Sequence, residues 1–262
     1  MRKLRIGKRV VSDNDHFVVA EIGHNFGGGP GRVERATDLI CEAKRCGVDA
    51  VKFQKRDNRT LYTEAFYNKP YDNENSYGAT YGEHREALEL SFEEHAALKE
   101  VADGNGLLYF ATPFDAPSVD FLERLGVSLY KVASGDLKTI PLLRLIGQTG
   151  KPVIMSTAGG TMDDIKRALD AIGHSNVAVL HCVAIYPTPP ELMNLRCIST
   201  LRDMLSNVIG LSDHFDGKWH IPLAYMLGAR IFEKHFTLSR AQKGTDHRFS
   251  LEPSGMKAMV ED

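Results

Sequence analysis

Two histidines stand at the ends of apolar, strand-like runs. His214 closes the segment "GLSDH" and His235 closes "IFEKH". An imidazole in such a place is costly to bury unless its ring nitrogens bond to something. Two such imidazoles beside the acidic Glu233 and Asp213 are typical ligands of a divalent metal, whereas a lone buried histidine is more often satisfied by hydrogen bonds. The pattern leaves both interpretations open, a shared metal and two hydrogen-bonded core histidines.

Two lysines occupy similarly apolar surroundings. Lys52 lies between Val51 and Phe53, and Lys131 lies between Tyr130 and Val132. A lysine is rarely buried in such a segment without an anionic partner. Hydroxyl side chains close to the ends of neighbouring apolar runs could join them as donors to a phosphate or another oxyanion. The predicted cradle consists of Lys52, Lys131, Thr112, Ser134, Ser156 and Ser212.

These side chains need a scaffold that brings distant segments together, and the pattern of the chain predicts one. Short β-branched runs alternate with helical patterns, which is typical of βαβ units and a parallel sheet. Eight strands with a helix after nearly every one indicate a (β/α)₈ TIM barrel, and we expect it to form a single domain over residues 1–262. A doubly wound open sheet is the alternative, but "GHNFGGGPG" after the first strand lacks the GxGxxG register. Strands are expected at 17–23, 49–54, 107–112, 128–134, 152–157, 177–182, 207–214 and 230–236, and helices at 32–47, 91–106, 116–125, 140–149, 161–173, 193–205 and 219–228.

Strand alternation predicts which side chains face the barrel mouth. Residues two apart point the same way, and in a barrel one parity faces the interior. At the carboxyl end of every predicted strand one parity contains a polar group, and two more polar residues follow the fourth strand. The set is Glu21, Lys52, Gln54, Thr112, Lys131, Ser134, Asp136, Ser156, His181, Ser212, His214, Glu233 and His235.

Composition narrows the class of protein. The chain has 262 residues, a formal net charge of −2 and 43% hydrophobic residues. No basic excess favours nucleic acid or an anionic membrane surface, and no apolar run approaches the length that spans a bilayer. Four cysteines without CxxC pairing are read as reduced thiols of a cytoplasmic protein. The long, tyrosine-rich segment 57–90 would leave a strand on the catalytic face, so we expect it to form a lid.

Nine motifs follow one another along the chain: "AEIGHN", "AVKFQ", "FATPFD", "YKVASGD", "KPVIMST", "LHCVAIYPTPPELMNLR", "GLSDH", "EKHFTL" and "GTDHRFSLEP". Together they resemble the barrel domain of the sialic acid synthases, a family that includes N-acetylneuraminate, legionaminate, pseudaminate and spore-coat polysaccharide synthases. The resemblance runs from about residue 17 to residue 256. It implies condensation of phosphoenolpyruvate with an N-acylated hexosamine such as N-acetylmannosamine, which gives a nonulosonic acid and phosphate.

The same resemblance implies roles for particular residues. His214 and His235 match the ligands of a Mn²⁺ or Mg²⁺ ion, which would act as a Lewis acid on the open-chain sugar aldehyde. Lys52, Thr112, Lys131, Ser134, Ser156 and Ser212 match the phosphoenolpyruvate pocket. Gln54, Tyr186, Asp136 and Asp246 match positions that handle the sugar, and either aspartate could assist proton transfer. We therefore expect catalytic roles for Lys52, Lys131, Asp136, His235 and Asp246, and a homodimer as the assembly.

The chain also departs from the family pattern. Phe26 and Gly27 stand where relatives commonly have an acidic or polar residue, and Ala184 replaces an Asn or Ser. The small antifreeze-like domain that follows the barrel in many relatives, and offers an arginine to the sugar, is not expected here; Arg85 of the lid segment could substitute. Two other functions stay open: a metal-dependent aldolase or lyase on sugar acids, and an inactive barrel that acts as a scaffold.

Overall fold

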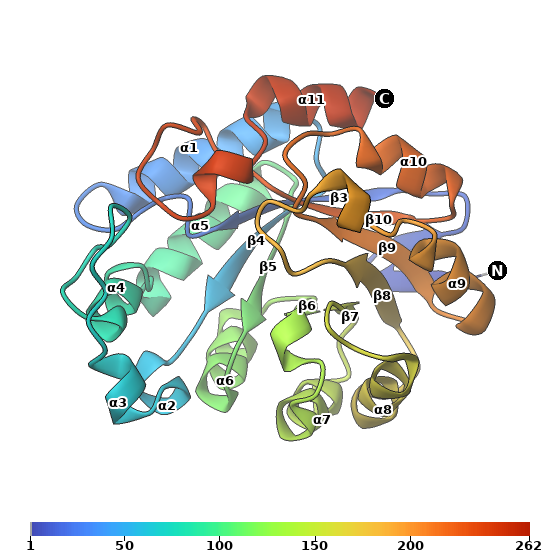
Figure 1. Cartoon of the computed structure of the whole chain (residues 1–262), viewed down its shortest axis with the longest axis horizontal. Coiled ribbons are helices and arrows are strands. Elements are labelled where there is room, and N and C mark those ends of the chain that lie inside the picture. The colour runs from blue at the N-terminus through green and yellow to red at the C-terminus, as the bar shows by residue number, and fades with distance from the viewer. Residues whose placement is uncertain (1) are drawn as a thin grey trace.

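A closed parallel barrel organises the chain. The computed structural model describes residues 2–262, and Figure 1 shows the strands surrounded by helices. Each strand pairs in parallel with the next along the chain, and β10 pairs with both β9 and β3, which closes the barrel. The predicted (β/α)₈ fold is confirmed. The barrel strands are β3 (Phe17–Gly23), β4 (Ala50–Lys55), β5 (Leu108–Pro113), β6 (Tyr130–Val132), β7 (Val153–Ser156), β8 (Val177–Cys182), β9 (Val208–Asp213) and β10 (Ile231–His235).

Helices follow the strands and cover the barrel from outside. Their starts obey simple capping chemistry: Ser91 and Thr161 each accept a hydrogen bond from the third helical residue, whose carboxylate returns to the cap backbone. No helix within residues 2–262 combines the length and apolar character needed to cross a bilayer. The outer helices are α1 (Arg32–Arg45), α5 (Phe92–Gly104), α6 (Ala116–Leu125), α7 (Ile140–Gln148), α8 (Met162–Ile172), α9 (Cys197–Met204), α10 (His220–Met226) and α11 (Pro253–Glu261).

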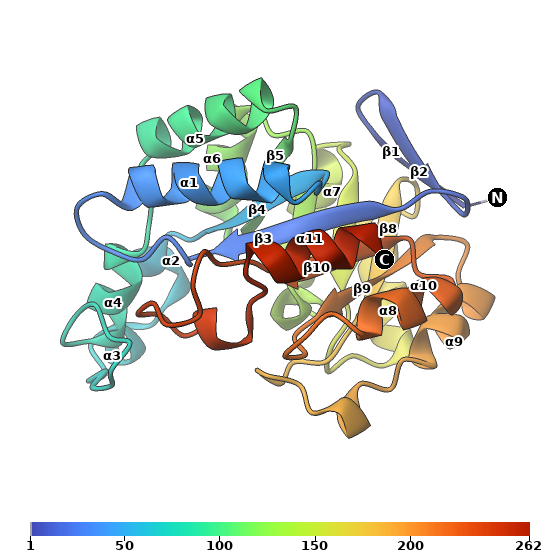
Figure 2. The same ribbon diagram turned by 90° about the horizontal axis from the view of Figure 1, so that it is seen from above.

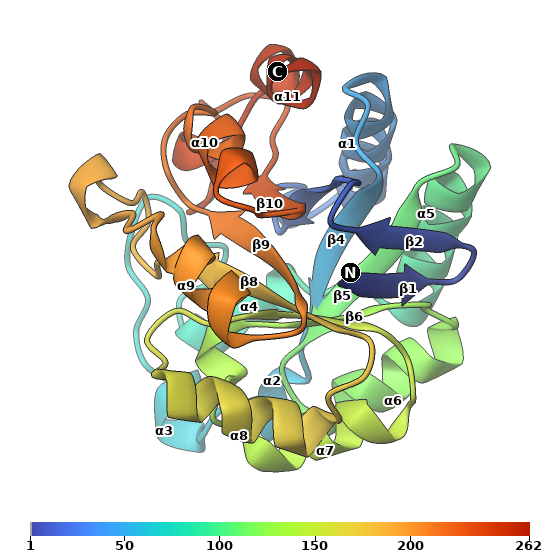
Figure 3. The same ribbon diagram turned by 90° about the vertical axis from the view of Figure 1, so that its right-hand side faces the viewer.

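An antiparallel hairpin precedes the barrel and was not predicted. Strands β1 (Lys3–Ile6) and β2 (Arg9–Ser12) pair with each other. Their side chains Leu4, Ile6 and Val11 are buried in one cluster with residues from the starts of the barrel strands, including Phe17 and Ala50. The hairpin therefore seals the amino-terminal end of the barrel, across which it lies in Figure 3.

The segment 57–90, expected as a long lid loop, contains three short helices: α2 (Asn58–Leu61), α3 (Glu64–Tyr67) and α4 (Tyr81–Ala87). It lies beyond the end of β4, far from the hairpin (Figure 2). The segment packs against itself: a Cβ on Gly82 would come within 2.3 Å of the Tyr67 ring, so only glycine fits that contact. Because it is internally packed, the segment holds its own residues at the mouth in defined positions.

Candidate active site

A cavity of about 620 Å³ opens at the carboxyl ends of the barrel strands. All eight strands contribute to its wall, as a (β/α)₈ barrel requires of its usual active-site face. The twelve residues expected from the sequence to act in catalysis, substrate binding or metal binding all line this one cavity. They are Lys52, Gln54, Thr112, Lys131, Ser134, Asp136, Ser156, Tyr186, Ser212, His214, His235 and Asp246.

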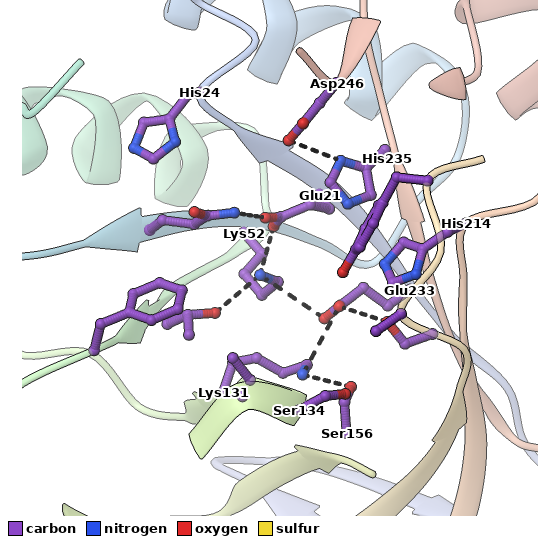
Figure 4. Close-up of a pocket in the computed structure, with 18 of the residues that line it drawn as sticks. Glu21, His24, Lys52, Lys131, Ser134, Ser156, His214, Glu233, His235 and Asp246 are labelled. Carbon is purple, nitrogen blue, oxygen red and sulfur yellow. Dashed lines mark hydrogen bonds and ion pairs between the residues drawn. The ribbon is translucent and has the colours of Figure 1, made fainter. Parts of the chain in front are cut away.

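The first lysine lies in a network at the centre of the cavity floor. Lys52 Nζ is 2.6 Å from Glu21 Oε2 and donates to Thr112 Oγ1 at 3.0 Å. Gln54 Nε2 donates to the other Glu21 oxygen at 2.7 Å (Figure 4). The anionic partner that a buried lysine needs is thus a carboxylate on the neighbouring strand. Sequence reasoning had assigned that position to a bound anion alone.

The second lysine lies opposite and is paired in the same manner. Lys131 Nζ donates to Ser156 Oγ at 2.7 Å and is 3.8 Å from Glu233 Oε1. Ser212 Oγ donates to that same carboxylate oxygen at 3.0 Å. Glu233 Oε2 is also 4.0 Å from Lys52 Nζ, so this carboxylate lies between the two ammonium groups (Figure 4).

The two glutamates sit in different electrostatic environments. Burial, reinforced by the nearby Glu233 charge, raises the pKa of Glu21 although Lys52 opposes the shift. Burial also acts to raise the pKa of Glu233, but the two lysines, together with the Ser212 hydrogen bond and His235, outweigh it and the net shift is downward. Opposite shifts in neighbouring carboxyls are a common feature of catalytic sites. Glu233 is therefore the persistent carboxylate, and Glu21 is the group that accepts a proton more readily.

The two histidines meet at the rim above this network. Their ring centroids are 5.4 Å apart, with the planes steeply inclined. His214 Nδ1 is 2.8 Å from the Val183 carbonyl, which can only accept, so this nitrogen carries a proton and Nε2 offers a lone pair when the ring is neutral. Burial acts to lower the pKa of His214, but hydrogen bonds to Cys182 and to the Val183 carbonyl outweigh it and the net shift is upward. Burial, with the charge of His214, holds the pKa of His235 well below its ordinary value.

This arrangement fits a divalent metal held by two imidazoles. A carbonyl that orients a histidine through its second nitrogen is the usual support behind a metal ligand. His235 Nδ1 is buried without a hydrogen bond and lies 3.6 Å from Asp246 Oδ2, which is placed to support the second ring in the same way. Among the described side chains, no group of three or more His, Cys, Asp or Glu residues is arranged to hold a metal. Any ion at the pair would therefore complete its shell with water or substrate oxygens.

Two of the residues expected to handle a sugar lie beside the histidines, and a third lies across the cavity. The Tyr186 ring lies 4.1 Å from the His214 ring, centroid to centroid, and closes one side of the mouth. Asp246 reaches in beside His235, as Figure 4 shows. Asp136 is on the far side, where burial raises its pKa although Thr139 donates a hydrogen bond to it. Two carboxyl groups thus reach the cavity from opposite sides.

Two expectations about side-chain direction were wrong. His181 does not face the mouth: its Nε2 is 2.7 Å from the Met193 carbonyl, on the outer side of β8. Its neighbour Cys182 lines the cavity instead, since it pairs in register with the inward-facing Ser212. Asp213 is not beside the histidines but on the outer side of the wall, where it pairs with Lys234.

That outer pair holds the strands from which the histidines project. Asp213 and Lys234 are register partners on β9 and β10, each directly before a histidine. Lys234 Nζ is 2.8 Å from Asp213 Oδ2 and also donates to the Phe215 carbonyl, and both charged side chains are fully buried. The ion pair therefore fixes the height of His214 relative to His235.

Some residues of the cavity wall were not predicted from the sequence. Arg56, just past the end of β4, and Arg85, on α4, both line the wall together with His24 and Phe114. Only Arg85 was considered beforehand. Arg56 sits one step beyond the strand in the direction of the lid, and continuing the inward parity of Lys52 and Gln54 by two residues would have identified it.

Comparison with known proteins places these features in a family context. Residues 39–262 match the model of the NeuB family. The N-acetylneuraminate-9-phosphate synthase of Drosophila melanogaster is 39% identical over 93% of this chain and 66% of its own length. The N,N'-diacetyllegionaminic acid synthase of Legionella pneumophila is 35% identical over 94% of this chain and 70% of its own.

Solved structures of other proteins also share the fold of this chain. The crystal structure of an N-acetylneuraminic acid synthetase from Leptospira borgpetersenii superposes with a TM-score of 0.87 at 31% identity, covering 99% of this chain and 87% of that one. A truncated 3-deoxy-D-arabino-heptulosonate 7-phosphate synthase from Thermotoga maritima shares the fold, with a TM-score of 0.73 at 14% identity over 99% of this chain and 89% of that one. The chain thus spans about two thirds of the length of the curated relatives named above.

Proposed function

The chain belongs to the NeuB family of sugar-acid synthases, and we propose that it condenses phosphoenolpyruvate with an N-acylated hexosamine to give a nonulosonic acid and phosphate. The observation that carries this proposal is the meeting of two buried lysines and a set of hydroxyls with two imidazoles in one cavity. The condensation needs a phosphate-binding site next to groups that activate an aldehyde. A lyase acting on an unphosphorylated sugar acid would not need the cradle.

The cradle binds the phosphate of phosphoenolpyruvate. Lys52 and Lys131 supply charge, and Thr112, Ser156 and Ser212 supply hydroxyl donors around them. Charge-assisted hydrogen bonds of this kind are stronger than neutral ones. Anchored here, the substrate has its C3 carbon directed at the rim where the sugar aldehyde is held.

The rim orients the sugar in its open-chain form. Tyr186 packs against the chain of the sugar, and Gln54 and Asp246 hydrogen-bond its polar groups. A Mn²⁺ or Mg²⁺ ion bound by His214 and His235 would supply Lewis-acid polarisation of the aldehyde carbonyl. The new C–C bond joins C3 of phosphoenolpyruvate to the aldehyde carbon.

Carboxyl groups take part in the remaining steps of the reaction. Bond formation leaves positive charge on the former enol carbon, which the Glu233 carboxylate between the two lysines stabilises. Water then adds to that carbon and the C–O bond to phosphate breaks. Asp136 and Asp246 are both placed for the accompanying proton transfers.

A labelled-substrate assay tests the reaction. Phosphoenolpyruvate carrying ¹⁸O at the bridging oxygen is incubated with Mn²⁺ and a panel of N-acetylmannosamine, mannose, diacetamido hexoses and hexosamine 6-phosphates. We expect phosphate release only with N-acylated sugars, and the label in the phosphate because the C–O bond breaks. Label retained in the organic product, or no release with any sugar, would refute the proposal; a lyase or an inactive scaffold would then be favoured.

Assembly and location complete the proposal. We propose a cytoplasmic homodimer, as the family resemblance implies. The exposed apolar side chains Trp219, Leu223 and Met226 along α10 are a surface that a second copy could cover. Light scattering of the purified chain measures its mass, and a monomer at assay concentration would contradict the dimer.

A further inference from the structure

The lid segment is hydrogen-bonded to the loop between β10 and α11, which brings Asp246 into the cavity. Tyr77 Oη donates to the Lys243 carbonyl at 2.8 Å, and the Gly244 N–H donates to Asn75 Oδ1 at 2.9 Å. In Figure 1 the teal lid segment meets the red β10–α11 loop. The lid segment therefore bonds to the backbone two and three residues before Asp246.

The Tyr77 side chain also packs on the loop that follows β3. Two glycines leave the space for it: a Cβ on Gly27 would lie 2.9 Å from the Tyr77 hydroxyl oxygen, and a Cβ on Gly28 would lie 2.9 Å from ring atom Cδ1. Arg35 of α1 holds the same loop by donating to the carbonyls of Phe26 and Gly28, at 2.6 and 2.8 Å. The tyrosine is therefore packed against a loop that is itself fixed.

Helix α4 holds Tyr77 from within the lid segment. The Tyr77 N–H donates to His84 Nδ1 at 3.2 Å, and the two rings stack with their centroids 5.9 Å apart. His84 is directly followed by Arg85, which lines the cavity. Burial raises the pKa of Tyr77 although the Gly28 backbone opposes the shift, so the hydroxyl stays protonated as a donor to the Lys243 carbonyl. One side chain thus connects α4, the loop after β3 and the β10–α11 loop.

The β10–α11 loop holds Asp246 beside the second histidine. Asp246 Oδ2 lies 3.6 Å from His235 Nδ1. The part of the loop after Asp246 is tied to the barrel, since Ser250 Oγ donates to the Asp246 carbonyl at 2.7 Å and Asn25 Nδ2 donates to Ser250 Oγ at 2.9 Å. The part before Asp246 receives the bond from Tyr77. The position of the carboxylate therefore depends on contacts from both sides, and one of them comes from the lid segment.

We propose that Tyr77 is a positioning residue for Asp246, because it couples the lid segment to the β10–α11 loop and so sets the distance between the Asp246 carboxylate and His235. The inference rests on the proposed condensation for the task of Asp246, and it adds the group that fixes its place. A displacement of about 1 Å in a group that acts on the substrate can lower a rate by about 100-fold. A small shift of the loop should therefore be measurable.

Hydrogen–deuterium exchange followed by mass spectrometry tests the coupling without any substrate, because local opening sets the exchange rate of a loop. Tyr77→Phe removes only the hydroxyl, and Asn75→Ala combined with it removes the second bond as well. We expect the amides of residues 240–248 to exchange about 5-fold faster in the single variant and about 30-fold faster in the double variant. Tyr71→Phe is the matched control, because its ring packs on Tyr81 within the lid segment. Exchange at 240–248 that matched this control in both variants would overturn the inference, whatever the activity.

Kinetics then test whether the coupling acts through Asp246. Tyr77→Phe is expected to lower kcat/KM for the acylated sugar by about 5- to 10-fold, while the KM for phosphoenolpyruvate stays within about twofold. In an Asp246→Asn background the same substitution should lower kcat/KM by less than about twofold, because the group that Tyr77 positions is already altered. Equal losses in both backgrounds, or a raised KM for phosphoenolpyruvate, would overturn the inference. Absence of phosphate release with every acylated hexosamine would instead remove the proposed function, and the exchange rates would still decide the coupling.

Discussion

Replacing Lys234 with methionine probes the ion pair behind the two histidines. Lys234 Nζ is 2.8 Å from Asp213 Oδ2, and neither side chain has any exposed surface. The substitution keeps most of the side-chain volume and removes the charge. Asp213 then keeps only the Phe215 backbone N–H, at 2.9 Å, and His220, at 3.8 Å.

The expected cost follows from the burial of Asp213. Removing one partner of a buried pair leaves an uncompensated charge and lowers the free energy of unfolding by about 3–5 kcal/mol. Natural domains have only about 5–15 kcal/mol in total, so the variant should be close to its stability limit. Removing both charges should cost far less: in Asp213→Asn with Lys234→Met, the amide oxygen still accepts from the backbone and no charge is left buried. We expect that double variant within about 1 kcal/mol of the parent chain.

Urea unfolding followed by circular dichroism measures these differences. Lys99→Met is the matched control, because Lys99 is 2.7 Å from Asp103 in an ion pair on the surface of α5. Such exposed pairs contribute at most about 1 kcal/mol. If Lys234→Met lowered the unfolding free energy no more than Lys99→Met, or if the double variant were as unstable as the single, the buried pair would not have the role assigned to it.

Three further predictions concern the metal, the cradle and the response to acid. His214→Ala and His235→Ala should each abolish Mn²⁺ binding by calorimetry together with turnover, and full activity of either variant in chelator would refute a shared metal. Ser156→Ala should lower kcat/KM for phosphoenolpyruvate by about 10- to 100-fold while the KM for the sugar is unchanged, since a hydrogen bond to a charged group is removed. Burial lowers the pKa of His95 to about 3, so the folded state resists its protonation, and the stability it contributes above about pH 6.5 is lost as pH falls towards 3. His95→Gln should flatten that acid limb in unfolding curves from pH 7.5 to 4, and an unchanged limb would show that other groups cause it.

The barrel was predictable because its strands repeat one pattern at even spacing. The elements that were missed lack such a pattern. The hairpin β1–β2 has strands of only four residues each. Its apolar side chains are buried by contact with the end of the barrel, and a local sequence pattern does not show such a contact. In the lid segment, Thr80 and Glu83 form a capping box that the sequence displays as T-x-x-E, so the start of α4 could have been found.

Site prediction failed where the parity of a strand could not be read. Strand β8, "VAVLHC", is buried along its whole length because helices cover one face and the barrel interior the other. An apolar run of this kind has no polar and apolar side, and His181 was assigned inward by its residue type alone. The register with β9 settles the matter, since Cys182 lies beside Ser212. Register is a tertiary property, and one sequence does not contain it.

Charge balance explains why the floor of the cavity combines lysines with glutamates. A lysine buried without a counter-charge would lose its proton or destabilise the fold, so a barrel with two interior lysines also needs interior carboxylates, and Glu21 and Glu233 are within 4.0 Å of them. In the proposed reaction, a phosphate that enters the floor must compete with those carboxylates, which limits its affinity but allows the product phosphate to leave.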